Sequence, residues 1–334
     1  MGRKCNIRVV TTTEPWTYNH GRNMVRPDTA LPEGVLPTDR LLAGGKPRPE
    51  LRGELRRIPG ARNAVAVLAT WGQVVAVVAG AVWIGHPLAY AAAFVLQGRN
   101  FARLAILGHE AAHRLLFANR RLNDGVGRWV LSYPTFSGFD NYRRAHFTHH
   151  RDELGPDEPD LGFYRGYPIS RASLRHKLTR DALFVSGYKN LKGLVRSWRF
   201  PAARPVLVRM AVVHLALFGV GVAIGRWWLY PLLWLAPWMS VWKVLNRLRA
   251  IAEHGGCIRS DDRRRTTHHV RQGFWARFWI VPFHTGWHLA HHVDMGVPWT
   301  NLPRLHDELV AAGWVTPEYE WPSYTALWRA MASG

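Results

Sequence analysis

The segment from Asn63 to Gly98 reads NAVAVLATWGQVVAVVAGAVWIGHPLAYAAAFVLQG and contains no Asp, Glu, Lys or Arg in its 36 residues. Gly85-His86-Pro87 interrupts it near the middle and leaves two apolar halves, each of which spans roughly 27 Å as a helix. The hydrocarbon core of a bilayer is about 30 Å thick. The segment therefore predicts a hairpin of two membrane-spanning helices over about residues 63–98.

A second apolar stretch, from Met210 to Trp242, carries a single charge, Arg226. Arg226 lies at its centre and is followed by Trp227 and Trp228, and paired tryptophans are typical of the membrane–water interface. We therefore expect a second membrane hairpin over about residues 207–242, with Arg226 at its turn.

The distribution of basic residues predicts the orientation of both hairpins. The 334 residues contain 44 Lys and Arg against 23 Asp and Glu, a net charge of +21, and all the basic residues except Arg226 lie outside the two apolar stretches, 63–98 and 210–242. Under the positive-inside rule, the termini and the middle segment face the cytosol. This distribution explains the basic character without a nucleic-acid partner. A mean hydropathy of −0.15 leaves one alternative open, a soluble helical protein with two buried hairpins.

The rest of the chain shows helical rather than strand patterns. Between Gly98 and Arg209, short apolar repeats with helical spacing alternate with Gly and Pro, which favours amphipathic helices on the membrane face. No alternating strand pattern is present. The sequence predicts an all-α fold.

Histidines gather in three clusters: HEAAH over 109–113, HFTHH over 146–150 and HLAHH over 288–292. On a helix, residues separated by three or four positions share one face, so each cluster can direct its imidazoles at one point. The candidate metal ligands are His109, His113, His146, His149, His150, His288, His291 and His292.

Eight imidazoles are too many for one ion, since a catalytic zinc takes about three protein ligands, so we expect two metal ions. Imidazole-rich sites suit iron, copper, zinc or nickel, and an oxidative task in a membrane protein favours iron. Two alternatives remain open. A membrane zinc protease would use His109, Glu110 and His113 but leaves six histidines unexplained. A non-catalytic metal-binding membrane protein would need no electron donor.

The three clusters resemble the histidine boxes of the membrane fatty acid desaturase family in spacing and order. The first follows the first hairpin, the second lies in the middle segment, and the third follows the second hairpin. Pro156–Asp160 is similar to an acidic motif of that family. The stretch from Val297-Pro298-Trp299 to His306, after the third cluster, also agrees with the family. The resemblance spans about residues 60–310, and it also covers hydroxylases, ketolases and epoxidases.

The resemblance implies a non-haem di-iron oxidoreductase that uses O2 and introduces a double bond into a lipid or fatty acyl chain. A hydroxylase on the same scaffold, acting on a lipid or a specialised metabolite, is the alternative. It also implies a ninth ligand, for which His254 is the candidate. The groups expected to orient ligand imidazoles are Glu110, Asp157, Asp160 and Asn246, because Ala290 stands where the family often has an acid in the third box.

The resemblance also implies how the chain is organised. We expect a cytosolic arm over 1–61, a catalytic domain over 62–310 with two hairpins (four helices) and a helical cap that holds the two irons, and a cytosolic tail over 311–334. No fused haem segment, cysteine set for an iron–sulfur cluster or nucleotide-binding glycine motif is present. Electrons are therefore expected from a separate ferredoxin, rubredoxin or b-type cytochrome and its reductase, attracted by the basic face.

Overall fold

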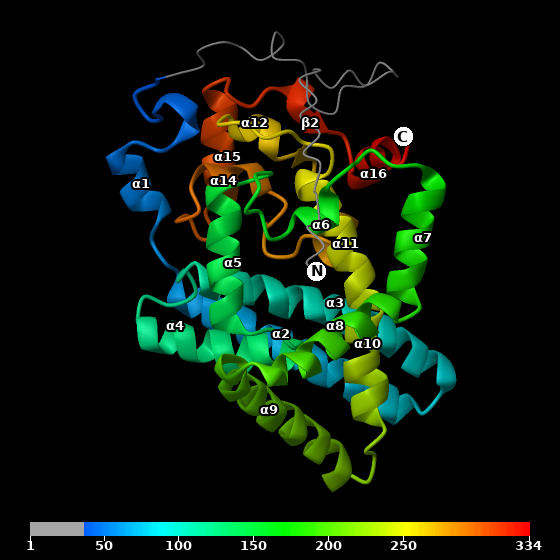
Figure 1. Cartoon of the computed structure of the whole chain (residues 1–334). Helices are drawn as coiled ribbons and strands as arrows, with labels where there is room; N and C mark the ends of the chain where they lie inside the picture. Colours follow the sequence, from blue (N-terminus) through cyan, green and yellow to red (C-terminus); the bar gives the residue numbers. More distant parts are fainter. Residues whose placement is uncertain (1–36) are drawn as a thin grey trace, which may run out of the picture.

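A computed structural model describes residues 37–334, and its regular structure is almost entirely helical (Figure 1). The expected all-α class is confirmed. Most of the predicted arm over 1–61 lies outside the described residues. The elements in chain order are α1 (Pro49–Leu55), α2 (Gly60–Ile84), α3 (Pro87–Ala112), α4 (Arg120–Val126), the π-helical η3 (Gly127–Ser132), α5 (Phe139–Arg151), α6 (Leu161–Tyr164), α7 (Arg171–Ala182), α8 (Val185–Arg196), α9 (Arg204–Ala223), the π-helical η7 (Pro231–Leu235), α10 (Ala236–Met239), α11 (Val241–His254), α12 (Arg263–Thr266), β1 (His269–Val270), α13 (Phe274–Trp279), α14 (His288–Val293), α15 (Leu302–Ala311), β2 (Glu320–Trp321) and α16 (Tyr324–Met331).

The first apolar segment forms the hairpin of α2 and α3, with its turn where Gly85-His86-Pro87 stands. Gly85 adopts a left-handed conformation with φ of 67°, which ends α2, and the next helix begins at Pro87. The His86 ring accepts a hydrogen bond from the backbone N–H of Leu88 at 3.2 Å. α3 then continues to Ala112, well beyond the apolar segment, and carries the first histidine cluster.

The second apolar segment also turns back at its centre, but its return path is broken. α9 ends at Ala223, and Gly225 is left-handed with φ of 67°. The chain returns through η7 and α10, kinks at Ser240, where φ is −119° and ψ is −88°, and resumes as α11. α11 ends at His254, so it leads directly from the second hairpin to a predicted ligand.

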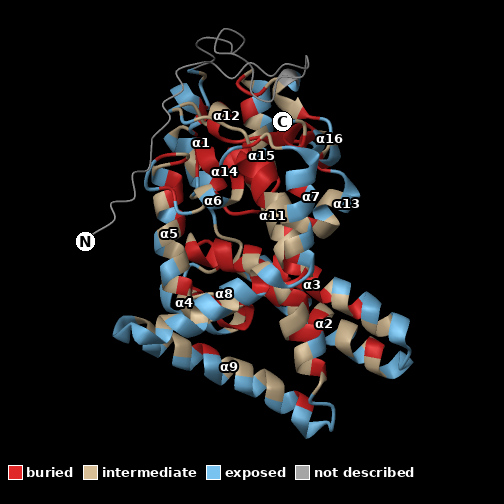
Figure 2. Cartoon of the chain, turned by 45° about the vertical axis from the view of Figure 1, so that its right-hand side comes forward, coloured by how far each residue is buried: buried red, intermediate tan, exposed pale blue. Residues whose placement is uncertain are grey.

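Two helical stretches, Pro49–Ile84 and Pro201–Ala223, are long and apolar enough to cross a membrane. Their most apolar windows are only 28% and 11% buried, whereas the core helix of a soluble protein would be mostly buried. Figure 2 shows the exposed surface of α9, and large apolar side chains such as Leu68, Trp83 and Leu215 are exposed. These surfaces fit association with a membrane.

The elements that carry the histidines pack together above the hairpins. α3 crosses α11 closely at Gly98, where an added Cβ would lie 2.3 Å from the Cβ of Val241. At the far end of α3, Arg143 of α5 donates to the carbonyl oxygens of Ala111 and Ala112 at 3.0 and 2.8 Å and pairs with Asp124 at 2.6 Å. These contacts set the first two histidine clusters against each other.

The C-terminal segment completes the same cap. β1 and β2 pair in parallel, with His269 opposite Glu320. α16 packs on α11, where the Trp328 indole donates to the Leu248 carbonyl at 2.9 Å, and Met331 is fully buried. The described part of segment 311–334 is thus packed against the helix that ends at His254.

Candidate metal centre

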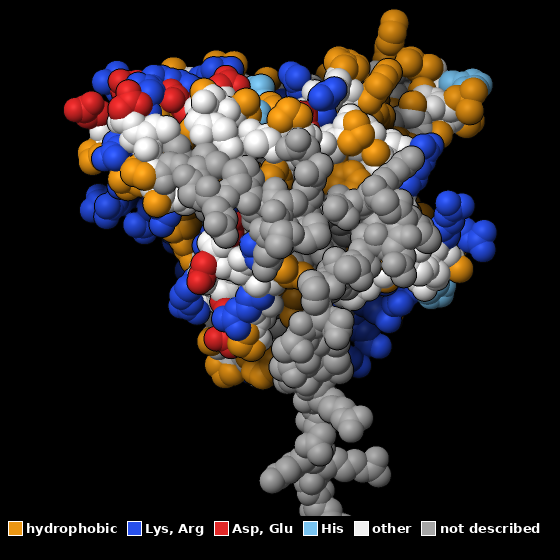
Figure 3. Space-filling model, turned by 90° about the horizontal axis from the view of Figure 1, so that it is seen from above, with side chains coloured by type: hydrophobic (Ala, Val, Ile, Leu, Met, Phe, Trp, Pro, Cys, Tyr) orange, Lys and Arg blue, Asp and Glu red, His pale blue; other side chains and the backbone are white. Residues whose placement is uncertain are grey.

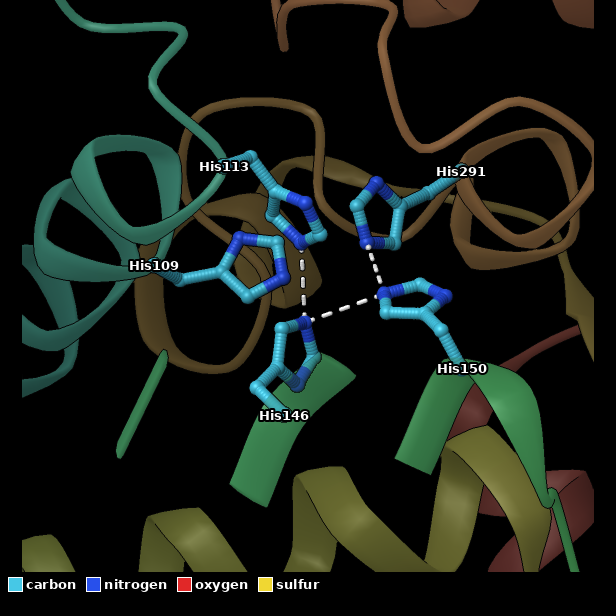
Figure 4. A group of neighbouring side chains, drawn as sticks. All are labelled: His109, His113, His146, His150 and His291. Atoms are coloured by element: carbon cyan, nitrogen blue, oxygen red, sulfur yellow. Dashed lines mark hydrogen bonds between the residues drawn. The ribbon is translucent and has the colours of Figure 1, made fainter. Parts of the chain in front are cut away.

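The structure gathers all nine histidines that the sequence proposed as metal ligands. One group has five residues, which come from the end of α3, from α5 and from α14; His113 directly follows α3. Figure 4 shows their rings turned toward one another. The other group combines four residues from α5, α11 and α14. Within each group the nearest side-chain nitrogens lie within 4.8 Å of one another. The groups are His109, His113, His146, His150 and His291, and His149, His254, His288 and His292.

In the group of five, the Nε2 atoms form a chain of short contacts. His146 lies 2.9 Å from His113 and 3.0 Å from His150, and His150 lies 3.1 Å from His291, each measured between Nε2 atoms. Each ring nitrogen either donates one proton or accepts with one lone pair. Because His146 and His150 each make two of these contacts, the three contacts cannot all be hydrogen bonds.

In the group of four, Nε2 atoms also converge, and partners at Nδ1 identify the tautomer. The Nδ1 atoms of His149 and His254 lie 2.8 Å from Glu158 and 2.7 Å from the Thr266 carbonyl, and His292 Nδ1 contacts Glu153. These oxygens accept hydrogen bonds, so each Nδ1 carries the proton. The inward Nε2 atoms therefore present lone pairs to one another.

Facing lone pairs repel unless a cation lies between them, so the donor set fits metal ions. Two imidazole nitrogens bound about 2.1 Å from one metal lie roughly 3.0 Å apart at right angles and 3.4 Å apart at a tetrahedral angle. Within the group of four, His288 Nε2 lies 3.0 Å from the Nε2 atoms of His254 and His292, and His149 lies 3.4 Å from His292. The spacings match what two metal-binding groups require.

Burial keeps most of these imidazoles neutral, which is the form that binds metal. It lowers the pKa of His113 to about 3 and holds the pKa values of His109 and His254 well below the ordinary value. His149 differs: burial opposes its charged form, but the hydrogen bond and charge of Glu158 outweigh burial and raise its pKa.

The four residues expected to orient imidazoles lie in different surroundings. Glu110 accepts a hydrogen bond from the Trp299 backbone N–H at 3.4 Å, and burial raises its pKa to about 8. Asp157 is exposed. Asp160 lies close enough to His149 to share a candidate ligand group with it and Glu158. Asn246 accepts a hydrogen bond from Arg249 at 3.4 Å.

The carboxylates that contact the histidines most closely are three glutamates outside the set expected to orient imidazoles. Glu158 contacts His149, and Glu153 contacts His292 and pairs with Arg263 at 2.8 Å. Glu253 lies 3.6 Å from His288 Nδ1. Glu158 lies within the acidic Pro156–Asp160 segment, and that segment was the signal available in the sequence.

A cavity of about 640 Å³ opens onto both histidine groups. Its walls are residues at helical spacing on α3, α8 and α11, several of them small: Ala105, Gly108, Gly193 and Ala250. Five histidines line it: His109 and His146 from the first group and His149, His254 and His288 from the second. A chain-like molecule in this cavity would therefore reach both groups.

A family model described as fatty acid desaturase matches residues 81–325. Dihydrorhizobitoxine desaturase of Bradyrhizobium elkanii is 26% identical over 257 residues, which cover 70% of this chain and 72% of the relative. An sn-1 oleoyl-lipid 12-desaturase of Arthrospira platensis is 24% identical over 256 residues, 68% of this chain and 71% of the relative. An sn-1 acyl-lipid omega-3 desaturase (ferredoxin) of Nostoc sp. (strain 36) is 23% identical over 285 residues, 75% and 73% of the two chains.

The family match covers most of the chain, including all three histidine clusters and the residues that bring them together. The chain belongs to the fatty acid desaturase family.

Proposed function

We propose that the protein is an O2-dependent di-iron desaturase that introduces a double bond into a lipid or fatty acyl chain. The observation that carries this proposal is the convergence of nine imidazoles in two groups, five of which line one cavity. Family membership and the names of three desaturase relatives support the reaction type. A protease that used only His109, Glu110 and His113 would leave the group of four without a role.

The residues divide the work as follows. Neutral imidazoles hold the metals, and Glu153, Glu158 and the Thr266 carbonyl keep Nδ1 protons on the outer side so that Nε2 lone pairs face inward. Two iron ions, when bound, supply the activation of dioxygen that removes hydrogen from an unactivated C–H bond. The cavity walls on α3, α8 and α11 align the substrate chain with both groups and exclude water from it.

We further propose that both hairpins cross the membrane, with the histidines on the cytosolic side. The positive-inside count and the exposed apolar faces of α2 and α9 support this topology. Figure 3 shows Lys and Arg side chains at several places on the described part of the cap face, with some Asp and Glu among them, and the net charge of +21 suits an acidic donor protein. Because the Nostoc relative is named as a ferredoxin enzyme, a ferredoxin is the donor we propose to test first.

Metal analysis and turnover test the proposal together. Purified protein should contain about two irons per chain, and His149→Ala or His291→Ala should lose metal and activity together. Product formation should require O2 and an external two-electron donor, and mass spectrometry should find a loss of two hydrogens rather than a gain of oxygen. One zinc without iron, or product formed anaerobically without a donor, would overturn the proposal.

A further inference from the structure

A lysine without an acidic partner lines the wall of the substrate cavity. Lys243 is partly buried near the start of α11, and its Nζ lies 3.9 Å from the centroid of the Trp238 ring. No ion pair or hydrogen bond joins its Nζ to another group among residues 37–334. The nearby Asp181 is occupied, because Arg247 holds it with two hydrogen bonds. A cation thus borders the cavity with only an aromatic face beside it.

Lys243 and the metal ligand His254 share one face of the same helix. They are eleven residues apart, which is close to three turns, so both project from the same side at an axial separation of roughly 16 Å. Asn246 and Ala250 lie between them along that face and line the same cavity. A ligand held at Lys243 therefore has a continuous path along α11 to the histidines.

Residues of α8 also line the cavity. The residues that contribute are at helical spacing on α8 and the turn after it: Asn190, Gly193, Leu194 and Ser197. A Cβ added at Gly193 would meet no atom within 4 Å. The cavity mixes these polar groups with apolar ones from α3, such as Leu104 and Ile106. This composition suits an amphiphile with one charged end better than a wholly apolar chain.

We propose that Lys243 binds the carboxylate of the substrate, so that the preferred substrate is an aliphatic acid whose chain runs along α11 from Lys243 toward the histidines. This inference rests on the proposed function, because it takes the cavity to be the desaturase substrate site. An ammonium without an anionic partner gains a charge-assisted hydrogen bond when a carboxylate arrives. An extended aliphatic chain of roughly a dozen bonds matches the axial separation of residues 243 and 254 along α11.

Competition binding to the purified, metal-loaded protein, without a reductant so that no turnover occurs, tests this assignment. The probes are laurate, its neutral methyl ester and dodecyl phosphate, each competing with radiolabelled laurate in a neutral detergent. The wild type should bind laurate about ten- to a hundredfold more tightly than the ester, as expected for a hydrogen bond to a charged group. Lys243→Gln should remove that preference, and Lys243→Arg should keep most of it.

Lys189→Gln is the matched control, because Lys189 is an exposed lysine on α8, and it should leave the preference unchanged. Melting temperatures establish that each variant is folded. Equal binding of acid and ester by the wild type, or a preference that survives in Lys243→Gln, would overturn the assignment. So would a preference for dodecyl phosphate, because the anion would then be a phosphate ester. Because this experiment measures binding, a negative result would refute the carboxylate site but not the proposed O2-dependent reaction. Purified protein that contains no iron would refute the proposed reaction but not the carboxylate site.

Discussion

At the scale of single residues, the two histidine groups differ in what holds their outer nitrogens. His149, His254 and His292 each have an oxygen acceptor at Nδ1. In the group of five, the Nδ1 atoms of His109 and His291 are buried without a hydrogen-bond partner among the described residues. An acceptor at Nδ1 fixes the ring and makes Nε2 more basic. We therefore expect the group of four to bind its metal more tightly.

Glu153→Gln should weaken binding of one of the two metals about 10- to 100-fold, because it removes the charge that polarises His292. Titration with a competing chelator measures this loss. Glu110→Gln is the matched control, since Glu110 contacts the Trp299 backbone and should show a smaller effect on metal affinity and only a partial loss of activity. Equal losses of metal in both variants would contradict the difference in roles.

The sequence predicts which histidines converge better than it predicts the groups that contact them. The spacing within each cluster places imidazoles on one face of a helix, and this local rule holds wherever the helix packs. Which acid of Pro156–Asp160 turns inward depends instead on the loop after α5, where Leu154 has a left-handed φ of 57°. That loop exposes Asp157 and directs Glu158 at His149, an outcome that no helical periodicity encodes.

At the scale of elements, Arg143 joins the helices of the first and second histidine clusters. It donates hydrogen bonds to the carbonyl oxygens at the end of α3 and forms an ion pair with Asp124 of α4. Arg143→Met should destabilise the cap by about 1.5–3 kcal/mol, since hydrogen bonds to charged groups contribute on that order. A melting curve measures this loss of stability, and metal analysis then shows whether the variant still binds metal. Arg121→Met, at an exposed position on α4, should leave both unchanged.

The same ion pair predicts a dependence of stability on pH. The hydrogen bond from Arg143 holds the pKa of Asp124 below its ordinary value. A carboxyl with a depressed folded pKa stabilises the protein above its unfolded pKa of about 3.9, and this contribution is lost as pH falls through the folded pKa. The melting-temperature gap between wild type and Asp124→Asn should therefore be full at pH 7 and shrink in acid. A constant gap would exclude the linkage.

The cavity can be blocked at α8 without disturbing the fold. Gly193 is helical, lines the cavity and has open space around its Cβ position. Gly193→Ala should stabilise α8 by about 0.4–1 kcal/mol and keep laurate binding. Gly193→Trp should retain the melting temperature but lose binding, as the competition assay would detect. If Gly193→Trp still binds laurate, the substrate does not occupy this part of the cavity.

At the scale of the whole molecule, charge-free runs predict four helices, while helical length and hydropathy identify two spanning stretches. The difference has a physical origin in the two return helices. α3 leaves the apolar segment at Gly98 and continues into the polar cap, and the second return path is divided by η7 and the kink at Ser240. The sequence predicts both turns at their observed positions, but it does not show these breaks.

Accessibility labelling of single cysteines in intact cells tests whether both hairpins cross the bilayer. Replacing Cys257 by Ser leaves Cys5 as a native probe for the N-terminus, and a Cys5→Ser, Cys257→Ser chain can receive His86→Cys or Arg226→Cys at the turns. Asp157→Cys and Thr325→Cys, both at exposed positions, report on the cap and the C-terminus. If the two apolar segments span, an impermeant reagent added outside should label only the two turn positions, because all the basic segments lie on the other side. Labelling of Asp157→Cys from outside would place the cap on the outer side and contradict the proposed orientation. Protection of Arg226→Cys would mean that α9 lies along the surface, and the second hairpin would then have to be drawn as an interfacial helix.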